Sequence, residues 1–344
     1  MSPAPRAALL TGKLPPALLA DLLASFPVAP SDVLLGPRIG EDACAIDVPG
    51  GVLVAATDPI TFTAQEIGRF SVVVNANDIA VMGVRPRWFL AVILLPSGST
   101  ESTVRDVFGS MRESLHHVGA TLVGGHTEVT PAVAQPIVVG QFLGIAEHRT
   151  YVTSGGMRPG DVLLQVGHAP VEGAAVLARQ AADRLTGLDP TLRDEALGAL
   201  DRPGISVVEA ALLAAELGAT AMHDPTEGGL AAGLHELAEA SAVGLRVDLS
   251  SVLWFGPGRA VCQALAADPM ATLASGSLLA AFRPDRAEAA LRVLAGHGHA
   301  ASDIGRAVEG SGVRDANARP LVWPERDEVA RLLSDESGGQ GGST

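Results

Sequence analysis

The sequence predicts an α+β protein that is folded into two domains. Its 344 residues are more than a single domain usually contains. Helix-type and strand-type hydrophobic patterns alternate in both halves, and a Gly- and Pro-rich stretch at residues 155–160 separates the halves. We therefore expect four regions: an N-terminal segment over 1–35, an N-terminal domain over 36–150, a C-terminal domain over 151–330, and a tail over 331–344.

The first half contains clear strand and helix signals in turn. Two short β-type runs within residues 43–57 flank Pro49-Gly50-Gly51, a pattern that is typical of a hairpin. A helix is predicted to end at Gly83 and another at Gly119, because glycine commonly follows the last turn of a helix. The predicted helices cover 67–82 and 101–118, and the predicted later strands cover 88–95, 121–123 and 136–145.

The second half mixes the same two periodicities. The predicted strands cover 162–166, 245–249, 277–282 and 301–308. The predicted helices cover 172–185, 205–217, 226–240 and 286–294. Residues 334–344 are rich in Ser and Gly, which predicts a disordered tail.

Composition excludes several classes of function. A formal net charge of −14 argues against a nucleic-acid partner, which requires a clustered basic surface. The apolar run over 205–221 is interrupted by Glu209 and Glu216, so it reads as an amphipathic helix and not as a membrane span. The start of the chain has too short an apolar run for a signal peptide, and the only two cysteines have no CxxC spacing. We expect a reduced, cytoplasmic protein.

Several familiar catalytic motifs are absent from the sequence. It has no G-x-x-x-x-G-K-[ST] segment, which excludes a P-loop, and no G-x-G-x-x-G after a strand. It also lacks the G-x-S-x-G of common α/β-hydrolases and the H-E-x-x-H or paired CxxC spacing of zinc sites.

Acidic residues at the ends of apolar segments remain as candidates. Asp42 precedes a predicted strand, Asp58 ends the next one, and Asp78 interrupts an apolar helix. Magnesium prefers such oxygen ligands and usually combines a few carboxylates with nucleotide phosphates. Taken singly, Asp58 could be a turn residue and Asp42 part of a solvated loop, whereas a carboxylate seldom enters an apolar helix without a partner.

The segment His223-Asp224-Pro225-Thr226-Glu227-Gly228-Gly229 has two compatible interpretations. Asp224 as N-cap, Pro225 at N1 and Glu227 at N3 would start a helix with a capping box. The free N–H groups of that helix N-terminus could equally bind a phosphate.

Gly124-Gly125-His126-Thr127-Glu128 follows a buried-type strand. His126 could be a general acid or base, or a loop histidine with a structural partner. Cys44 lies among apolar residues, which favours a small core side chain over a nucleophile.

Read together, these segments resemble the superfamily of aminoimidazole ribonucleotide (AIR) synthase, which includes HypE, thiamine-monophosphate kinase (ThiL) and selenophosphate synthetase. Six motifs occur in the family's order, covering most of the chain from about Gly12 to Gly305. They are Gly36–Ala43, Thr57-Asp58, Asn77–Pro86, Gly124–Val129, His223–Leu230 and Ala274–Leu279. The resemblance implies an N-terminal domain whose strands form a barrel with a second subunit in a homodimer. It also implies a C-terminal α/β domain, with ATP and Mg²⁺ in a cleft near the dimer interface.

The resemblance also implies roles for individual residues. Metal or phosphate-side ligands would be Asp42, Asp58 and Asp78. Nucleotide contacts would be Asn77, Gly124, Gly125 and Thr127. Asp224 and Thr226 would face the substrate side, and Lys13, the only lysine, could close over phosphates or lie on the surface. The candidate catalytic residues are His126, Glu128 and Asp224, and the candidate cofactor-binding residues also include Lys13 and Thr226.

The motif His-Asp-Pro-Thr-x-Gly-Gly-Leu resembles the HypE-like branch. HypE dehydrates a thiocarboxamide on its own C-terminal cysteine, whereas this chain ends Gly341-Gly342-Ser343-Thr344, so we do not expect that self-modification here. His126 stands where several relatives carry an acidic residue, which leaves the number of metal ions open.

The resulting hypothesis is a Mg-ATP-dependent enzyme that activates an amide, carboxamide or phosphate-bearing substrate by phosphoryl transfer. The alternatives are a ThiL-like small-molecule kinase and a non-catalytic nucleotide-binding maturation or scaffold protein. We expect a homodimer, acting on a small molecule or a protein terminus, with neither a nucleic-acid nor a membrane partner.

Overall fold

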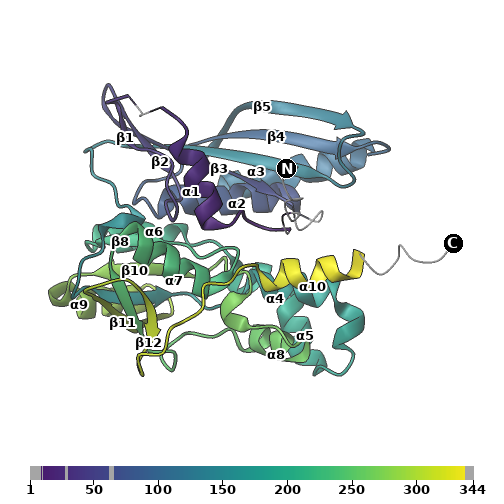
Figure 1. Cartoon of the computed structure of the whole chain (residues 1–344). Helices are drawn as coiled ribbons and strands as arrows, with labels where there is room; N and C mark the ends of the chain where they lie inside the picture. Colours follow the sequence, from purple (N-terminus) through teal and green to yellow (C-terminus); the bar gives the residue numbers. More distant parts are fainter. Residues whose placement is uncertain (1–8, 10, 28–29, 62–65, 338–344) are drawn as a thin grey trace, which may run out of the picture.

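The computed structural model describes residues 9, 11–27, 30–61 and 66–337. Two six-stranded sheets, each covered by helices, form two stacked units (Figure 1). The upper unit in Figure 1 is built from the first half of the chain and the lower unit from the second half. The predicted α+β fold with two domains is therefore confirmed.

The first sheet has the strand order β1-β2-β3-β6-β4-β5. Its strand pairs are antiparallel except for β4 and β5, which run parallel. Helices α2 and α3 pack together, and α2 lies against β3 and β6. The elements are α1 (Pro16–Ala24), β1 (Val33–Leu35), β2 (Cys44–Val48), β3 (Gly51–Ile60), α2 (Ile67–Ala80), β4 (Trp88–Pro96), α3 (Glu101–Val118), β5 (Thr121–Thr130) and β6 (Ile137–Ala146).

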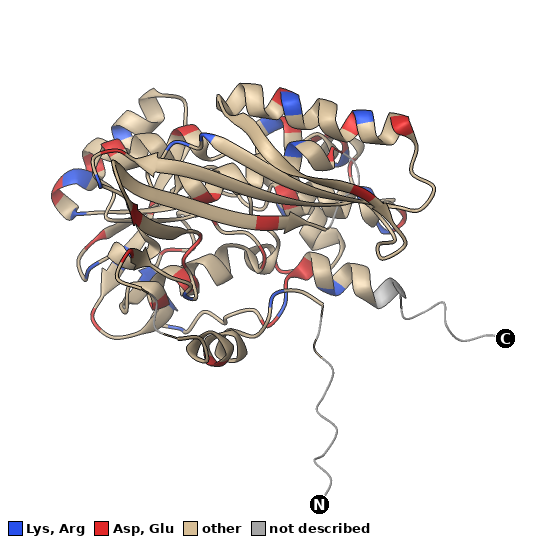
Figure 2. Ribbon diagram, turned by 90° about the horizontal axis from the view of Figure 1, so that it is seen from above, with Lys and Arg blue, Asp and Glu red and all other residues tan. Residues whose placement is uncertain are grey.

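Strand β5 lies at one edge of this sheet and is exposed along nearly its whole length. Exposed apolar side chains on it are Leu122, Val123 and Val129. Seen from above, the strands of the sheet are mostly tan, the colour of uncharged residues (Figure 2). An edge strand of this kind offers unpaired backbone groups and apolar surface to another chain.

The second sheet has the strand order β12-β9-β11-β7-β10-β8, antiparallel except for the pair β12 and β9. Helices α6 and α9 contact one another and β10, while α7 contacts β8, β9 and β12. Helices α4, α5, α8 and α10 share a separate apolar cluster. The elements are β7 (Val162–Val166), α4 (Glu172–Gln180), α5 (Pro190–Leu197), α6 (Val208–Glu216), β8 (Ala221–His223), α7 (Gly229–Ala240), β9 (Gly244–Val247), α8 (Gly256–Ala264), β10 (Leu278–Phe282), α9 (Pro284–Gly296), β11 (Ala301–Val308), β12 (Gly312–Asp315) and α10 (Glu328–Ser337).

Helix α2 joins the two units. It contacts the first sheet on one side and α6 of the second unit on another, so it is buried almost all round. Side chains of both units, among them Ile79 and Ala211, belong to one apolar core. Polar residues within such a helix must find partners, because an unpaired buried polar group is costly. This placement brings Asp78 to the boundary between the two units.

Most predicted elements are confirmed, and the differences have local causes. The strand predicted over 121–123 continues to Thr130, because the register shifts at Val123 and Gly124 and Gly125 then pair with Leu90 and Ala91 and do not form a loop. Gly125 has a φ of 146°, and a Cβ at this position would collide with the carbonyl oxygen of Ala91. The helix predicted over 172–185 divides into α4 and a 3₁₀ turn at Ala182–Leu185. Helix α10 includes Ser334–Ser337, which the sequence assigned to a tail, and residues 338–344 lie outside the described residues.

No helix in the described part of the chain is both long and apolar enough to cross a membrane.

The two cysteine thiols are predicted to differ in reactivity. Cys262 is fully buried in α8 near the Thr272 hydroxyl, and burial raises the pKa of its thiol to about 11. Cys44 on β2 is half-buried. Because the thiolate is the reactive form and a buried thiol reacts only after local opening, iodoacetamide should alkylate Cys44 at least about tenfold faster than Cys262 in the native protein. Peptide mass spectrometry over time measures both rates, and equal rates would contradict the burial of Cys262.

Candidate active site

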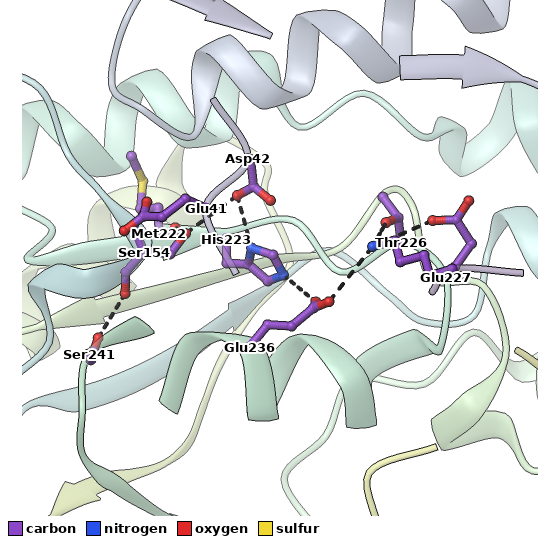
Figure 3. A network of polar contacts seen from close by, with 10 residues as sticks. Glu41, Asp42, Ser154, Met222, His223, Thr226, Glu227, Glu236 and Ser241 are labelled. Atoms are coloured by element: carbon purple, nitrogen blue, oxygen red, sulfur yellow. Dashed lines mark hydrogen bonds and ion pairs between the residues drawn. The ribbon is translucent and has the colours of Figure 1, made fainter. Parts of the chain in front are cut away.

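A cavity of about 410 Å³ opens where the two units meet. Its walls come from the N-terminal segment at Lys13, the loop before β2, the start of α7 and the segment that precedes α10. Segments that are far apart in sequence are therefore adjacent here. The polar contacts at its centre are drawn in Figure 3.

The loop before β2 is held against α7 by a glycine. Gly40 has a φ of 79°, and a Cβ here would lie 2.6 Å from the carbonyl oxygen of Glu236, which no side chain tolerates. The next residue, Glu41, accepts a hydrogen bond from the Ser154 backbone N–H at 3.1 Å. These two constraints direct the Asp42 carboxylate toward His223 (Figure 3).

His223 lies between two carboxylates and contacts one with each ring nitrogen. Its Nδ1 lies 2.9 Å from Oδ2 of Asp42, and its Nε2 lies 3.0 Å from Oε2 of Glu236. Burial lowers the pKa of His223, but the two carboxylates raise it more, so the pKa is well above its usual value. The pKa of Glu236 falls to about 2, because His223 and Lys13 outweigh the effect of its burial. The imidazole is therefore charged at neutral pH and fixes the position of Asp42.

Three further aspartates share this electrostatic environment. Burial raises the pKa of Asp58 to about 6, with a contribution from the charge of Glu227. Burial and the neighbouring aspartates raise the pKa values of Asp78 and Asp224 well above their usual range. Asp58 is positioned by its backbone N–H, which donates to Oδ1 of Asn75 at 2.7 Å. The charges of Asp42, Asp58 and Asp78 thus act on one another and on Asp224 of the other unit, while the metal-ligand role of the first three stays a prediction.

The side chain of Lys13 reaches into the same place. Its Nζ donates to Oγ1 of Thr226 at 3.3 Å and lies 3.6 Å from Glu227 and 3.7 Å from Glu236. Burial lowers the pKa of Lys13, but the surrounding carboxylates raise it more, so it remains charged. The structure therefore places Lys13 in the wall of the cavity, with Thr226 as its hydrogen-bond partner.

The capping box predicted at the start of α7 is wrong. The helix begins at Gly229, not near Thr226, because Gly228 and Gly229 have φ values of 82° and 65° that break the helical path. Both carboxylate oxygens of Asp224 are buried without a hydrogen-bond partner among the described residues, so Asp224 caps nothing. The backbone N–H of Gly228 donates to Oδ2 of Asp327 at 2.7 Å, so a carboxylate of the chain already binds this N–H group.

Asp327 should make stability depend on pH. It is buried, it accepts backbone N–H groups from Gly228 and Val329 on its two oxygens, and burial raises its pKa to about 7. A carboxyl group whose pKa is higher in the folded state than in the unfolded state stabilises the fold fully at pH values below its unfolded-state pKa. That stabilisation is lost as the pH rises through the folded-state pKa of about 7. The free energy of unfolding of the wild type minus that of Asp327→Asn should therefore fall between pH 5 and 7.5, by on the order of 1.4 kcal/mol per unit of pKa shift. Urea denaturation across this range measures the difference, and a rising or flat difference would contradict the assignment.

Six of the predicted site residues do not meet the aspartates within one chain. Asn77 is buried, and its amide is satisfied by the Ile205 carbonyl and the Val207 N–H, both at 2.9 Å, so it braces the connection between the units. The other five lie on β5, which is three strands away from the β3 strand of Asp58, or roughly 14 Å at the usual strand spacing. They are Gly124, Gly125, His126, Thr127 and Glu128.

The β5 residues contact one another and line a cavity that is separate from the one at Asp42. Nε2 of His126 lies 3.3 Å from Oε2 of Glu128, and both side chains are exposed. Gly124, Gly125, His126 and Thr127 line a separate cavity of about 200 Å³. Their assignment to the site remains a prediction that requires a second chain.

Two residues of this polar network were not predicted as site residues from the sequence. His223 was part of a recognised motif but had no assigned role, and Glu236 was not considered. One signal for Glu236 exists, because it interrupts the buried run of α7 between Leu234 and Leu237. A carboxylate at such a position needs a partner. Sequence spacing could not show that the partner is His223.

The carboxylates fit a hard cation that brings ligands of its own. Among the described residues, no three His, Cys, Asp or Glu side chains form a group that could hold a metal ion unaided. Magnesium does not need such a cage, because it usually takes one or two carboxylates and completes its shell with water and phosphate. The unpartnered oxygens of Asp224 and the mutual repulsion of Asp58 and Asp78 are what a cation would relieve.

Comparisons with known proteins agree with this fold and site. Residues 40–146 match the family model described as AIR synthase related protein, N-terminal domain, and residues 158–315 match the corresponding C-terminal domain. The chain is 30% identical over 285 residues to carbamoyl dehydratase HypE of Cupriavidus necator, covering 79% of this chain and 78% of that protein. It is 31% identical over 259 residues to selenide, water dikinase of Nitratidesulfovibrio vulgaris, covering 72% and 70%. A crystal structure of HypE in complex with ATP matches with a TM-score of 0.69 at 25% identity, covering 86% of this chain and 92% of that one.

The chain therefore belongs to the AIR synthase-related family. Within that superfamily it lies on the HypE-like branch, as predicted, and it is an enzyme of the superfamily.

Proposed function

We propose that the chain is a Mg-ATP-dependent enzyme that activates an amide, carboxamide or phosphate-bearing substrate by phosphoryl transfer. The observation that carries this proposal is a group of four electrostatically interacting aspartates: Asp42 and Asp58 line the cavity together with Lys13, and Asp78 and Asp224 are buried beside them. Such a group costs free energy in the absence of a cation. The match to a HypE structure with bound ATP supports the nucleotide.

Each part of the site has a task in this proposal. Asp42, Asp58 and Asp78 would hold Mg²⁺, which would neutralise charge on the transferring phosphoryl group. Charged His223 keeps Asp42 in place through its 2.9 Å contact and is itself held by Glu236. Lys13, beside Thr226, would lie over the phosphates and close the cavity from the N-terminal side. Positioning and charge stabilisation are the main contributions that proteins make to phosphoryl transfer.

The nucleotide site would be completed in a homodimer. The exposed apolar side chains of β5 and its unpaired edge support pairing with the same strand of a second copy. Pairing at this edge alone would leave the partner's β5 farther from these aspartates than this chain's own β5. The predicted roles of His126, Thr127 and Glu128 therefore require that the two sheets also close into the barrel that the family resemblance implies. We place the enzyme in the cytoplasm, where the free thiols of Cys44 and Cys262 would stay reduced.

Calorimetric titration with ATP tests the proposal. The wild type should bind ATP at least about tenfold more tightly with Mg²⁺ than with EDTA, because the aspartates repel free phosphates. Asp42→Asn should lose at least about tenfold in Mg-ATP affinity, as expected when a charged ligand is removed from a buried site. Asp106→Asn, an exposed change on α3, is the matched control. Absence of Mg-dependent binding by the wild type would refute the proposal.

A further inference from the structure

Three arginines form a row across one face of the second sheet. Arg306 on β11 lies directly opposite Arg246 on β9, and Arg246 lies directly opposite Arg314 on β12. All three residues are exposed. Because neighbouring strands lie about 4.8 Å apart, this arginine row places three positively charged side chains in line at intervals of about 5 Å.

Little of the charge of the arginine row is neutralised within the chain. Arg306 pairs with Asp303, whereas the Arg246 side chain has no ion pair or hydrogen bond among the described residues. The carboxylates that adjoin the row in sequence already have other donors. Asp248 accepts hydrogen bonds from two serine hydroxyls, and Asp315 accepts them from two backbone N–H groups.

An alignment of this kind costs stability, because like charges that lie directly opposite one another on neighbouring strands repel. Arg314 donates a hydrogen bond to the carbonyl oxygen of Ala318 at 3.4 Å, but a neutral acceptor leaves the charge in place. A basic composition does not explain the row, since the chain has 38 acidic residues against 24 Lys and Arg. An uncompensated basic row on such a protein favours an interaction surface for a negatively charged partner.

A shallow strip runs beside the arginine row on the same face. Two positions along each strand, Val308 lies opposite Gly244, and Gly244 lies opposite Gly312. The two glycines project no side chain, which allows another element to approach the sheet closely. Helix α7 packs on the opposite face, where Leu245 and Val313 belong to the apolar core of this unit.

The interval of the arginine row fits carboxylates on a helix. Residues three or four positions apart on a helix have Cβ atoms about 5–6 Å apart, which is close to the interval of the row. In an extended strand, the residues of one face are roughly 6.7 Å apart, so successive carboxylates would fall out of step with the arginines. A guanidinium group can bind a carboxylate through two parallel hydrogen bonds, which adds directional specificity.

We propose that the arginine row is a docking surface for an acidic helix of a partner protein. The helix would lie across β11, β9 and β12, with carboxylates one turn apart facing Arg306, Arg246 and Arg314 and with its backbone beside the shallow strip. Among the described residues that line the cavity at Asp42, none belongs to the row. The inference therefore goes beyond the proposed function and does not depend on it.

Two alanine-rich helical peptides of about 20 residues test the docking. Both contain the same number of glutamates, which lie one turn apart on a single face in one peptide and are distributed around the helix in the other. Fluorescence anisotropy at about 50 mM NaCl should show the wild type binding the single-face peptide at least about fivefold more tightly. Raising the salt to about 500 mM should weaken that binding at least about fivefold, because salt screens exposed charges.

Arg246→Gln removes the central charge of the row. It should weaken binding of the single-face peptide at least about threefold, and it should raise the urea midpoint because it relieves two like-charge contacts. Arg112→Gln, an exposed change on α3, is the matched control and should leave both quantities unchanged. Mg-ATP affinity should be the same in all three proteins, so failure of the proposed function would leave this test intact.

Equal binding of the two peptides by the wild type, or a preference that Arg246→Gln does not reduce, would overturn the inference. A lower urea midpoint for Arg246→Gln without any loss of peptide binding would assign the row a structural role. Tighter binding of an oligodeoxythymidylate with the same number of negative charges would indicate a nucleic-acid surface and would also overturn it.

Discussion

Replacing Asp78 with asparagine should make the ligand-free protein more stable and, at the same time, abolish Mg-dependent ATP binding. Asp78 is buried in α2, and its pKa is raised well above the usual value by burial and by the charges of Asp58, Asp224 and Asp42. Asparagine has nearly the same shape but no charge to desolvate or repel. Replacing a charged, destabilising residue of a functional site by a neutral one of the same shape commonly raises the free energy of unfolding, here by about 1–2 kcal/mol.

Urea denaturation at pH 7.5 measures the gain, and repeating it with Mg-ATP separates stability from binding. At a nucleotide concentration of 100 times Kd, the wild type should gain about 2.7 kcal/mol from the ligand. Asp78→Asn should gain almost none. Asp106→Asn should behave as the wild type in both measurements. A loss of stability in ligand-free Asp78→Asn would show that this aspartate stabilises the fold and would remove its metal role.

Replacing His223 with leucine should destabilise the protein by about 3–5 kcal/mol, the cost of leaving buried carboxylates without their cation. His223 is 3% exposed and contacts Asp42 and Glu236 through its two ring nitrogens. Without it, Asp42 and Glu236 would be left close together, with Lys13 as the remaining neighbouring cation. The position of Asp42 would also be lost, so Mg-ATP affinity should fall.

A double-mutant cycle separates the interaction energy of His223 with Glu236 from the loss of packing. Adding Glu236→Leu to His223→Leu removes one of the unpaired carboxylates, so the double variant should cost less than the sum of the two single changes. His297→Leu, an exposed change at the end of α9, should stay within about 0.5 kcal/mol of the wild type. Additive effects of the two buried changes would indicate that His223 and Glu236 act independently.

The fold was largely predictable because most elements bury one face in a regular pattern. The ends of helices were also predictable where capping residues mark them. In α3, the Thr100 side chain accepts a hydrogen bond from the Thr103 N–H at 3.2 Å, and Gly119 ends the helix with a φ of 75°. The errors occurred where glycine had another function. Gly124 and Gly125 suggested a loop but lie within β5, and Gly228 and Gly229 delay the start of α7. Local pattern alone does not show which close approach a glycine permits.

The aspartate group was predictable only through ordered motifs. Asp42 and Asp58 belong to the first sheet and its preceding loop, Asp78 to the helix that joins the units, and Asp224 to the second unit. No periodicity connects such positions. Glu236 could have been suspected as a charge in a buried helix face. That its partner is His223 is a property of the tertiary structure.

The most direct test of the central claim is a crystal structure with Mn²⁺ and a non-hydrolysable ATP analogue, read by anomalous scattering. Manganese accepts the same oxygen ligands as magnesium and can be located without ambiguity. We predict an anomalous peak bound by carboxylate oxygens of at least two of Asp42, Asp58 and Asp78, with the analogue's phosphates completing its shell. An analogue bound with its metal elsewhere, while these aspartates touch neither, would contradict the account.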